Sequence, residues 1–126
     1  MEGLAGVHNM LGGLVVVAFV VTAVLAAIQA AGRTGEGARY ASFVATGLLL
    51  LQYVVGVALL GSGARNATIH FVVALLVIVP VALQHTSARR LGPQSRGLAI
   101  LIWALAATLL SIIAYLTGLQ GAPSSA

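Results

Sequence analysis

The chain has 126 residues, of which 60% are hydrophobic and only 6% are charged, with a formal net charge of +4. A soluble domain typically carries about 25% charged residues, so this composition excludes a soluble globular protein and indicates an integral membrane protein. Cysteine is absent, which excludes disulfides, thiolate metal sites and covalent c-type haem attachment. The basic residues are all arginines near predicted helix ends, where they are topology signals, so the charge does not indicate a nucleic-acid partner.

Four apolar segments are each long enough to cross about 30 Å of hydrocarbon at about 1.5 Å per residue. Short segments rich in Gly, Ser, Arg or Pro separate them and are typical of loops. Because short loops join antiparallel neighbours, we predict an all-α, up-down-up-down four-helix transmembrane bundle in a lipid bilayer. We expect one domain over residues 1–119 and a flexible tail over residues 120–126. The predicted spans cover about residues 4–31, 40–60, 67–84 and 97–116.

The arginines predict the orientation of the bundle. The second loop contains only Arg65, and the first and third loops contain the other five: Arg33, Arg39, Arg89, Arg90 and Arg96. The positive-inside rule then places the first and third loops in the cytoplasm and both termini on the outer side. Basicity that comes from arginine alone, with heavy use of Ala, Gly and Val, is typical of a GC-rich prokaryote. We therefore expect a multi-pass protein of a prokaryotic cytoplasmic membrane.

Two features within the spans bear on packing. Pro80 removes one backbone donor and is expected to bend the third helix near its cytoplasmic half. In the fourth span, small side chains recur at steps of three and four, which allows a neighbouring helix to approach closely. That neighbour is either the rest of the bundle or a second copy. The stripe comprises Ala104, Ala107, Ser111, Ala114 and Gly118.

Two histidines lie at matched depth in the predicted spans. His8 is about four residues into the first span and His70 about three residues into the third, roughly 5 Å below the outer helix ends. The first and third helices share a direction and face each other diagonally in a four-helix ring. A polar ring is costly to bury without a partner, so we predict that both histidines ligate a metal and clamp a flat haem from its two faces. The alternative is that each is an interfacial residue hydrogen-bonded to a loop or headgroup.

The residues near the pair are small or polar. One helical turn beyond each histidine stands a small residue, Gly12 or Ala74, which leaves room for a macrocycle. Gly56 faces the same region, and Gln52 on the same helix face either lines the pocket or hydrogen-bonds a neighbouring helix. Arg65, in the loop above, is expected to pair with haem propionates. These residues complete the predicted cofactor-binding set.

His85 is different because it follows His70 by 15 residues, roughly 22 Å along the helix. It stands beside the arginine-rich third loop, and no second histidine lies on that side. We interpret it as an interfacial residue.

The stretch LQYVVGVALLGSGARNATIHFVVALL resembles the haem A synthase family. In that family a helix with an LQ-x-x-(L)-G pattern precedes a short loop and a helix that opens with a ligand histidine. Leu51, Gln52 and Gly56 match the first pattern, His70 takes the ligand place, and His8 falls where the family has its other ligand. The resemblance covers roughly two-thirds of the chain. It implies a four-helix bundle with one b-type haem held by paired histidines near the outer face.

The sequence departs from that family at two positions. The family usually carries a glutamate three residues before the first histidine and an arginine just after it, and here those places are Ala5 and Asn9. The glutamate is tied to oxidation of the haem methyl group, so its replacement bears directly on enzymatic activity. The chain is also half the usual length, and half-size members are thought to pair as dimers.

Three functions remain open. The first is a b-type haem protein in electron transfer or haem handling, since paired histidines fill both axial positions and favour electron transfer. The second is a half-size haem A synthase acting as a dimer. The third is a cofactor-free accessory subunit of a respiratory or photosynthetic membrane complex. A small multidrug transporter is excluded because its mechanism needs an acid within the membrane, and the only acids, Glu2 and Glu36, lie outside the apolar runs.

Overall fold

The computed structural model describes residues 2–120, and this part of the chain is helical with no strand. Four of its segments are long and apolar enough to span a membrane, which confirms the predicted fold class. The third span is made of α3, α4 and η1 together, over Thr68–Arg90. The elements are α1 (Glu2–Ala30), α2 (Gly37–Gly61), α3 (Thr68–Leu76), α4 (Ile78–Ser87), η1 (Ala88–Arg90) and α5 (Pro93–Gln120).

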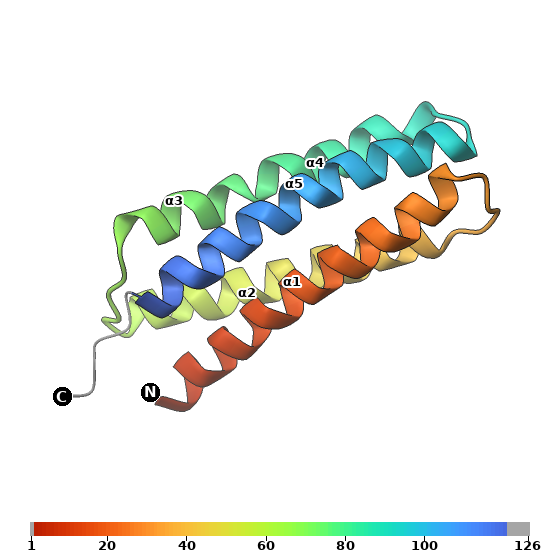
Figure 1. Cartoon of the computed structure of the whole chain (residues 1–126). Coiled ribbons are helices and arrows are strands. Elements are labelled where there is room, and N and C mark those ends of the chain that lie inside the picture. Colours follow the sequence, from red (N-terminus) through yellow and green to blue (C-terminus); the bar gives the residue numbers. More distant parts are fainter. Residues whose placement is uncertain (1, 121–126) are drawn as a thin grey trace.

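Successive spans run in opposite directions along one bundle (Figure 1). The connection between α2 and α3 lies at the same end as the start of α1 and the end of α5. We call this the histidine end, because His8 and His70 lie near it. The opposite end carries the first and third loops, and we call it the arginine end after Arg33, Arg39, Arg89, Arg90 and Arg96.

The helices are longer than the hydropathy pattern predicts. Hydropathy marks the part of a helix that suits hydrocarbon, whereas the hydrogen-bonded backbone continues through the polar residues at each end. The fourth span shows this clearly, since α5 begins at Pro93, a residue well suited to the first helical turn, and continues to Gln120. Gln120 was expected in the tail and is helical instead, and residues 121–126 lie outside the described part.

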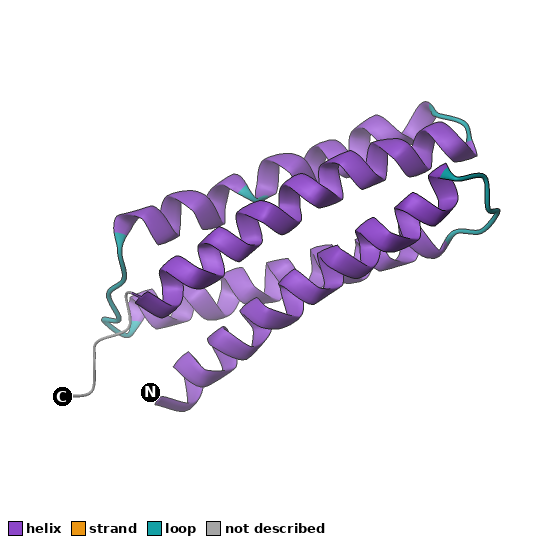
Figure 2. Cartoon of the chain, viewed as in Figure 1, coloured by secondary structure: helices purple, strands orange, loops and turns teal. Residues whose placement is uncertain are grey.

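Pro80 has a local effect on the third span. Proline has no N–H to donate to the carbonyl four residues earlier, and the regular helix is interrupted at Val77, between α3 and α4 (Figure 2). Val77 keeps right-handed helical angles, with φ −58° and ψ −28°. The span therefore continues through the interruption as one membrane-crossing segment.

The core follows the seam between α5 and its neighbours. The most extensive helix packing is that of α1 on α5 and α2, and α5 packs in turn on α3 and α4. Four members of the small-residue stripe, Ala104, Ala107, Ser111 and Ala114, are buried inside the bundle, so the stripe is an internal seam. The largest apolar cluster along it contains Val15, Phe19, Ala45, Leu49, Val77, Val81 and Ala107.

Large apolar side chains cover the outward faces of all four spans, among them Val17, Leu50, Leu76 and Leu109. Such a continuous apolar surface is stable in hydrocarbon and not in water. The protein is therefore a multi-pass membrane protein surrounded by a lipid bilayer.

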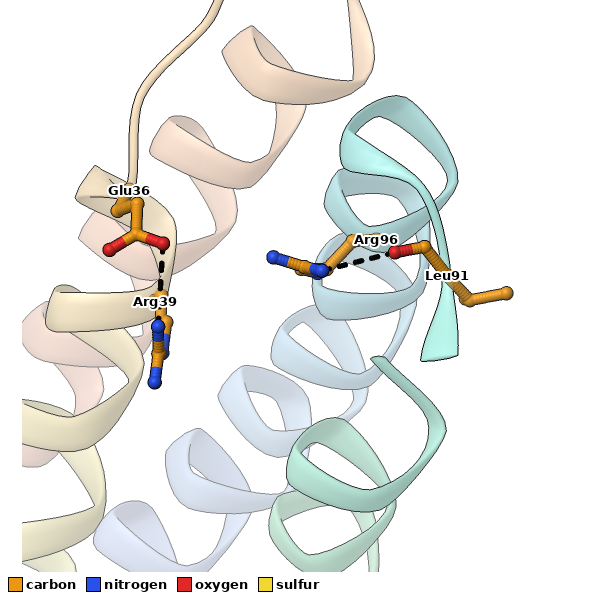
Figure 3. Close-up of polar contacts among 4 residues, drawn as sticks. All are labelled: Glu36, Arg39, Leu91 and Arg96. Carbon is orange, nitrogen blue, oxygen red and sulfur yellow. Dashed lines mark hydrogen bonds and ion pairs between the residues drawn. The ribbon is translucent and has the colours of Figure 1, made fainter. Parts of the chain in front are cut away.

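Polar contacts close the arginine end. Arg39 Nη1 pairs with Glu36 Oε1 at 3.3 Å, and Arg96 Nη2 donates to the Leu91 carbonyl at 3.1 Å (Figure 3). The buried Gln29 side chain donates to the Pro93 carbonyl at 2.9 Å and so ties the end of α1 to the start of α5. Of these three contacts, the Gln29 bond is the one that joins two helices, while the other two are local to the starts of α2 and α5.

Gly97 allows the close approach of α5 to α1. A Cβ atom at this position would lie 2.7 Å from the Ala30 backbone nitrogen and 3.0 Å from the Ala26 carbonyl oxygen. We expect Gly97→Ala to destabilise the bundle by about 1–3 kcal/mol, because backbone cannot move aside as a side chain can. Unfolding in mixed micelles titrated with sodium dodecyl sulfate measures this effect. Gly47→Ala, where nothing lies within 4 Å, is the matched control, and equal stability of the two variants would contradict the assignment.

Candidate paired-histidine site

His8 on α1 and His70 on α3 converge at the histidine end of the bundle. Their ring centroids lie 6.2 Å apart, and the ring planes meet at 75°. The two helices are not closely packed on each other in the described residues, because α2 and α5 lie between them around the bundle. The structure therefore brings the rings together across the bundle axis, as the matched depth of the two positions predicted.

His70 is oriented by the backbone of α5. Its Nδ1 lies 2.8 Å from the Ala114 carbonyl oxygen. A carbonyl can only accept, so Nδ1 donates, and Nε2 of the neutral ring keeps its lone pair. Gly118 provides the space for this contact, since a Cβ atom there would lie 3.0 Å from His70 Cε1.

His8 is oriented by α2. Its Nε2 lies 3.3 Å from the side-chain nitrogen of Gln52, and its Nδ1 is buried without a partner among the described residues. A Cβ atom at Gly56 would lie 3.1 Å from His8 Cε1, so glycine allows the ring to lie against α2. The Gln52 nitrogen can only donate, so Nε2 of the neutral His8 ring accepts and Nδ1 carries the proton, whereas in neutral His70 Nε2 is the nitrogen with the free lone pair.

A cavity of about 580 Å³ surrounds the two rings. This volume is in the range of about 300–1,000 Å³ that is common for sites of small molecules and cofactors. Two further buried polar atoms on its wall, Gln52 Oε1 and Ser111 Oγ, have no partner among the described residues. All seven residues of the predicted set line it: His8, Gly12, Gln52, Gly56, Arg65, His70 and Ala74.

The structure assigns particular positions to four of these residues. Gly12 was predicted to leave room for a macrocycle, but the space beside it is occupied by Tyr115 and Gln52, whose nearest atoms would lie 3.1 and 3.2 Å from a Cβ atom there. Ala74 accepts a hydrogen bond from the Tyr53 hydroxyl through its backbone carbonyl. Gln52 lines the cavity and also contacts His8 on α1. The two predicted roles of this residue are therefore compatible. Arg65 is exposed at the rim of the cavity.

The contributions of α5 and of Tyr53 were not predicted. Ser111, Ala114 and Gly118 belong to the small-residue stripe, and the same three residues line the cavity next to His70. The signal was present in the sequence, because the stripe continues to the depth of the histidines. A stripe of small residues indicates that a neighbouring helix approaches closely. It does not show that the Ala114 carbonyl accepts a hydrogen bond from the His70 ring.

His85 lies apart from this site, on α4 towards the arginine end. Its Nε2 lies 2.9 Å from the Thr46 hydroxyl, and its ring stacks on Phe43 with centroids 5.1 Å apart. These contacts give His85 a structural partner on α2.

The donor set limits the kind of metal site. In residues 2–120 no group of three or more His, Cys, Asp or Glu side chains gathers as a metal site. A closed tetrahedral site needs about four protein ligands. A histidine pair instead fits a metal whose other ligands come from a macrocycle.

No family model, curated protein or solved structure matches the chain. The resemblance to the haem A synthase family therefore stays a prediction from the residues quoted above.

The contact with Ala114 predicts one tautomer for neutral His70. We expect Nδ1 to carry the proton and Nε2 to be unprotonated, because only this form donates to a carbonyl. Nitrogen-15 NMR of histidine-labelled protein in lipid nanodiscs distinguishes the two tautomers, with His70→Asn identifying the signal. Protonation at Nε2 in neutral His70 would contradict the contact.

Proposed function

We propose that the protein is a membrane-embedded b-type haem protein, with one haem per bundle that His8 and His70 would hold as its paired histidine ligands. The observation that supports this most directly is the 6.2 Å between the ring centroids. With metal–nitrogen bonds of about 2 Å and about 1 Å from each nitrogen to its ring centroid, two imidazoles on opposite faces of one metal have centroids about 6 Å apart. The observed spacing thus suits a single ion between the rings.

The hydrogen bonds around the pair also fit ligation. A metal-binding histidine usually donates its other ring N–H to a carbonyl or carboxylate, which fixes the tautomer and makes the ligating nitrogen more basic. The Ala114 carbonyl does this for His70. Ligation of His8 through its unpartnered Nδ1 would leave the ring proton on Nε2, so the Gln52 amide would have to turn until its own unpartnered Oε1 accepts from Nε2–H.

The other residues of the cavity would hold the ring and exclude water. Gly56 and Gly118 allow the histidine rings to lie against their helices, and the apolar wall between them offers the surface that a porphyrin needs. Arg65 at the rim would pair with propionates. A haem with histidine at both axial positions supplies one-electron transfer, since no position is open for oxygen.

Electron transfer or haem handling suits the site better than haem oxidation. Ala5 and Asn9 both line the cavity, so the two places that hold glutamate and arginine in the haem A synthase family face the site. None of the described residues on the cavity wall is a carboxylate. We therefore favour an electron-transfer or haem-handling protein over the two alternatives, a half-size haem A synthase acting as a dimer and a cofactor-free accessory subunit. A homodimer or a larger membrane complex would provide the redox partner.

We also propose that the histidine end faces the outer side of a prokaryotic cytoplasmic membrane. Five arginines stand at the opposite end, in or beside the first and third loops, and only Arg65 stands at the histidine end. The positive-inside rule assigns the arginine-rich loops to the cytoplasm.

We expect haem-replete expression to give a purified protein with a Soret band typical of paired histidine ligation. His8→Ala and His70→Ala should each lower haem affinity by at least about 100-fold, because each removes one axial ligand. The matched control is His85→Ala, which should keep the band. Wild-type protein without a Soret band would favour the accessory subunit, and haem A formed on coexpression with haem O synthesis would favour the enzyme.

Cysteine scanning tests the orientation, since the chain has no native cysteine. In intact cells, a membrane-impermeant maleimide should label Ser62→Cys, in the loop at the histidine end. It should label Thr34→Cys, in the first loop, only after the cells are permeabilised. The reverse pattern would overturn the proposed orientation without affecting the haem site.

A further inference from the structure

The bundle is open on one side at the histidine end. In the described residues α2 is not closely packed on α3 or α4, whereas the other neighbouring spans pack closely. Side chains bridge this wider gap with three hydrogen bonds: Tyr53 to the Ala74 carbonyl, His85 with Thr46, and Gln84 to Ser42. On α2 the bridge nearest to the histidine end is that of Tyr53, so the described hydrogen bonds leave the last two turns of α2 unconnected to α3.

The cavity reaches the surface through this gap, and also beside the start of α1, where Ala5 and Asn9 line it and are exposed. A side chain that both lines a cavity and is exposed marks the place where the cavity wall meets the outside. Val57 on α2 and Leu75 on α3 line the cavity and are 68% and 62% exposed. Leu60 on α2 lines it too and is also exposed. These residues are all aliphatic, so the opening suits lipid and not water.

The depth of the opening agrees with this polarity. Val57 is four residues, about 6 Å, from the end of α2, and Leu75 is seven residues, about 10 Å, from the start of α3. Both side chains therefore lie within the hydrocarbon of the leaflet at the histidine end. Arg65 and Asn66 stand beyond them, at the headgroup level, on the rim of the same cavity. The cavity is thus apolar on its lipid side and polar at its rim.

We propose that the gap between α2 and α3 is a lateral portal through which a tetrapyrrole enters the site from the bilayer. A porphyrin with two carboxylates partitions into a membrane with its ring among the acyl chains and its acids near the headgroups. The portal presents apolar and basic residues at those two levels. Val57 and Leu75 form its two sides, the Tyr53–Ala74 bridge crosses it at the level of Leu75, and Arg65 meets the carboxylates. The class of ligand rests on the proposed function, whereas the position of the opening rests on the cavity alone.

The test measures how fast the ring enters the full-length protein in nanodiscs. Hemin and metal-free protoporphyrin IX are delivered from phosphatidylcholine vesicles. The Soret band follows hemin, and fluorescence follows protoporphyrin, which needs no histidine ligand. Val57→Trp and Leu75→Trp narrow the portal, and Val57→Ala widens it. Val54→Trp is the matched control, because Val54 is 66% exposed on the same helix and does not line the cavity.

We expect each narrowing variant to slow uptake of both rings by at least about tenfold, with the final amount bound unchanged, and Val57→Ala to speed it. Val54→Trp should remain within about twofold of the wild type. If hemin binds through the histidines but all variants take it up at the control rate, the portal is wrong and the proposed function stands. If protoporphyrin uptake follows the portal variants but hemin gives no histidine-dependent band, the portal stands and the proposed function is wrong. If neither ring binds the wild-type protein, both are wrong.

Discussion

The histidine end of the bundle is organised by the need of two half-buried imidazoles for polar partners. An unpaired polar group in hydrocarbon costs several kcal/mol, so a histidine among apolar helices constrains the backbones around it. His70 meets this need through the Ala114 carbonyl, which requires α5 to come close enough for a 2.8 Å contact. His8 meets it through Gln52, which requires the ring to lie against α2 at Gly56. The ring positions, and hence the 6.2 Å between them, follow from these two contacts.

The small residues of α5 make this arrangement possible without loss of packing. At the arginine end, Gly97 lets α5 approach the backbone of α1, and towards the middle Ala104 and Ala107 are fully buried between helices. At the histidine end the same stripe continues as Ser111, Ala114 and Gly118, but there it faces an imidazole and a cavity. One sequence feature therefore serves two purposes along its length: helix packing where apolar side chains meet it, and orientation of a histidine where a polar ring does.

The sequence was sufficient to predict the number of spans, the depth of the histidines and seven residues of the cavity wall. These depend on periodicity and on distance along a helix, which are local properties of a chain. The partner of His70 could not be predicted, because it depends on which turn of α5 stands opposite α3, and that register is set by packing in three dimensions. Tyr53 was missed for the same reason, since its hydroxyl acts on the backbone of another helix. The helices extend past most of the predicted spans because hydropathy reports on the solvent a residue prefers and not on the backbone hydrogen bonds that define a helix.

The polar bridges towards the arginine end explain how the bundle can keep one side open. Interhelical hydrogen bonds in membranes are worth about 0.6–2 kcal/mol each, so the bonds of Ser42 with Gln84 and of Thr46 with His85 hold α2 to α4 without close backbone packing. In each bridge the long side chain, Gln84 or His85, comes from α4 and reaches a short hydroxyl side chain on α2. The separation continues along α2 past Tyr53 towards the histidine end, where no further side-chain hydrogen bond joins α2 to α3 in the described residues. There it becomes the opening beside His8 and His70.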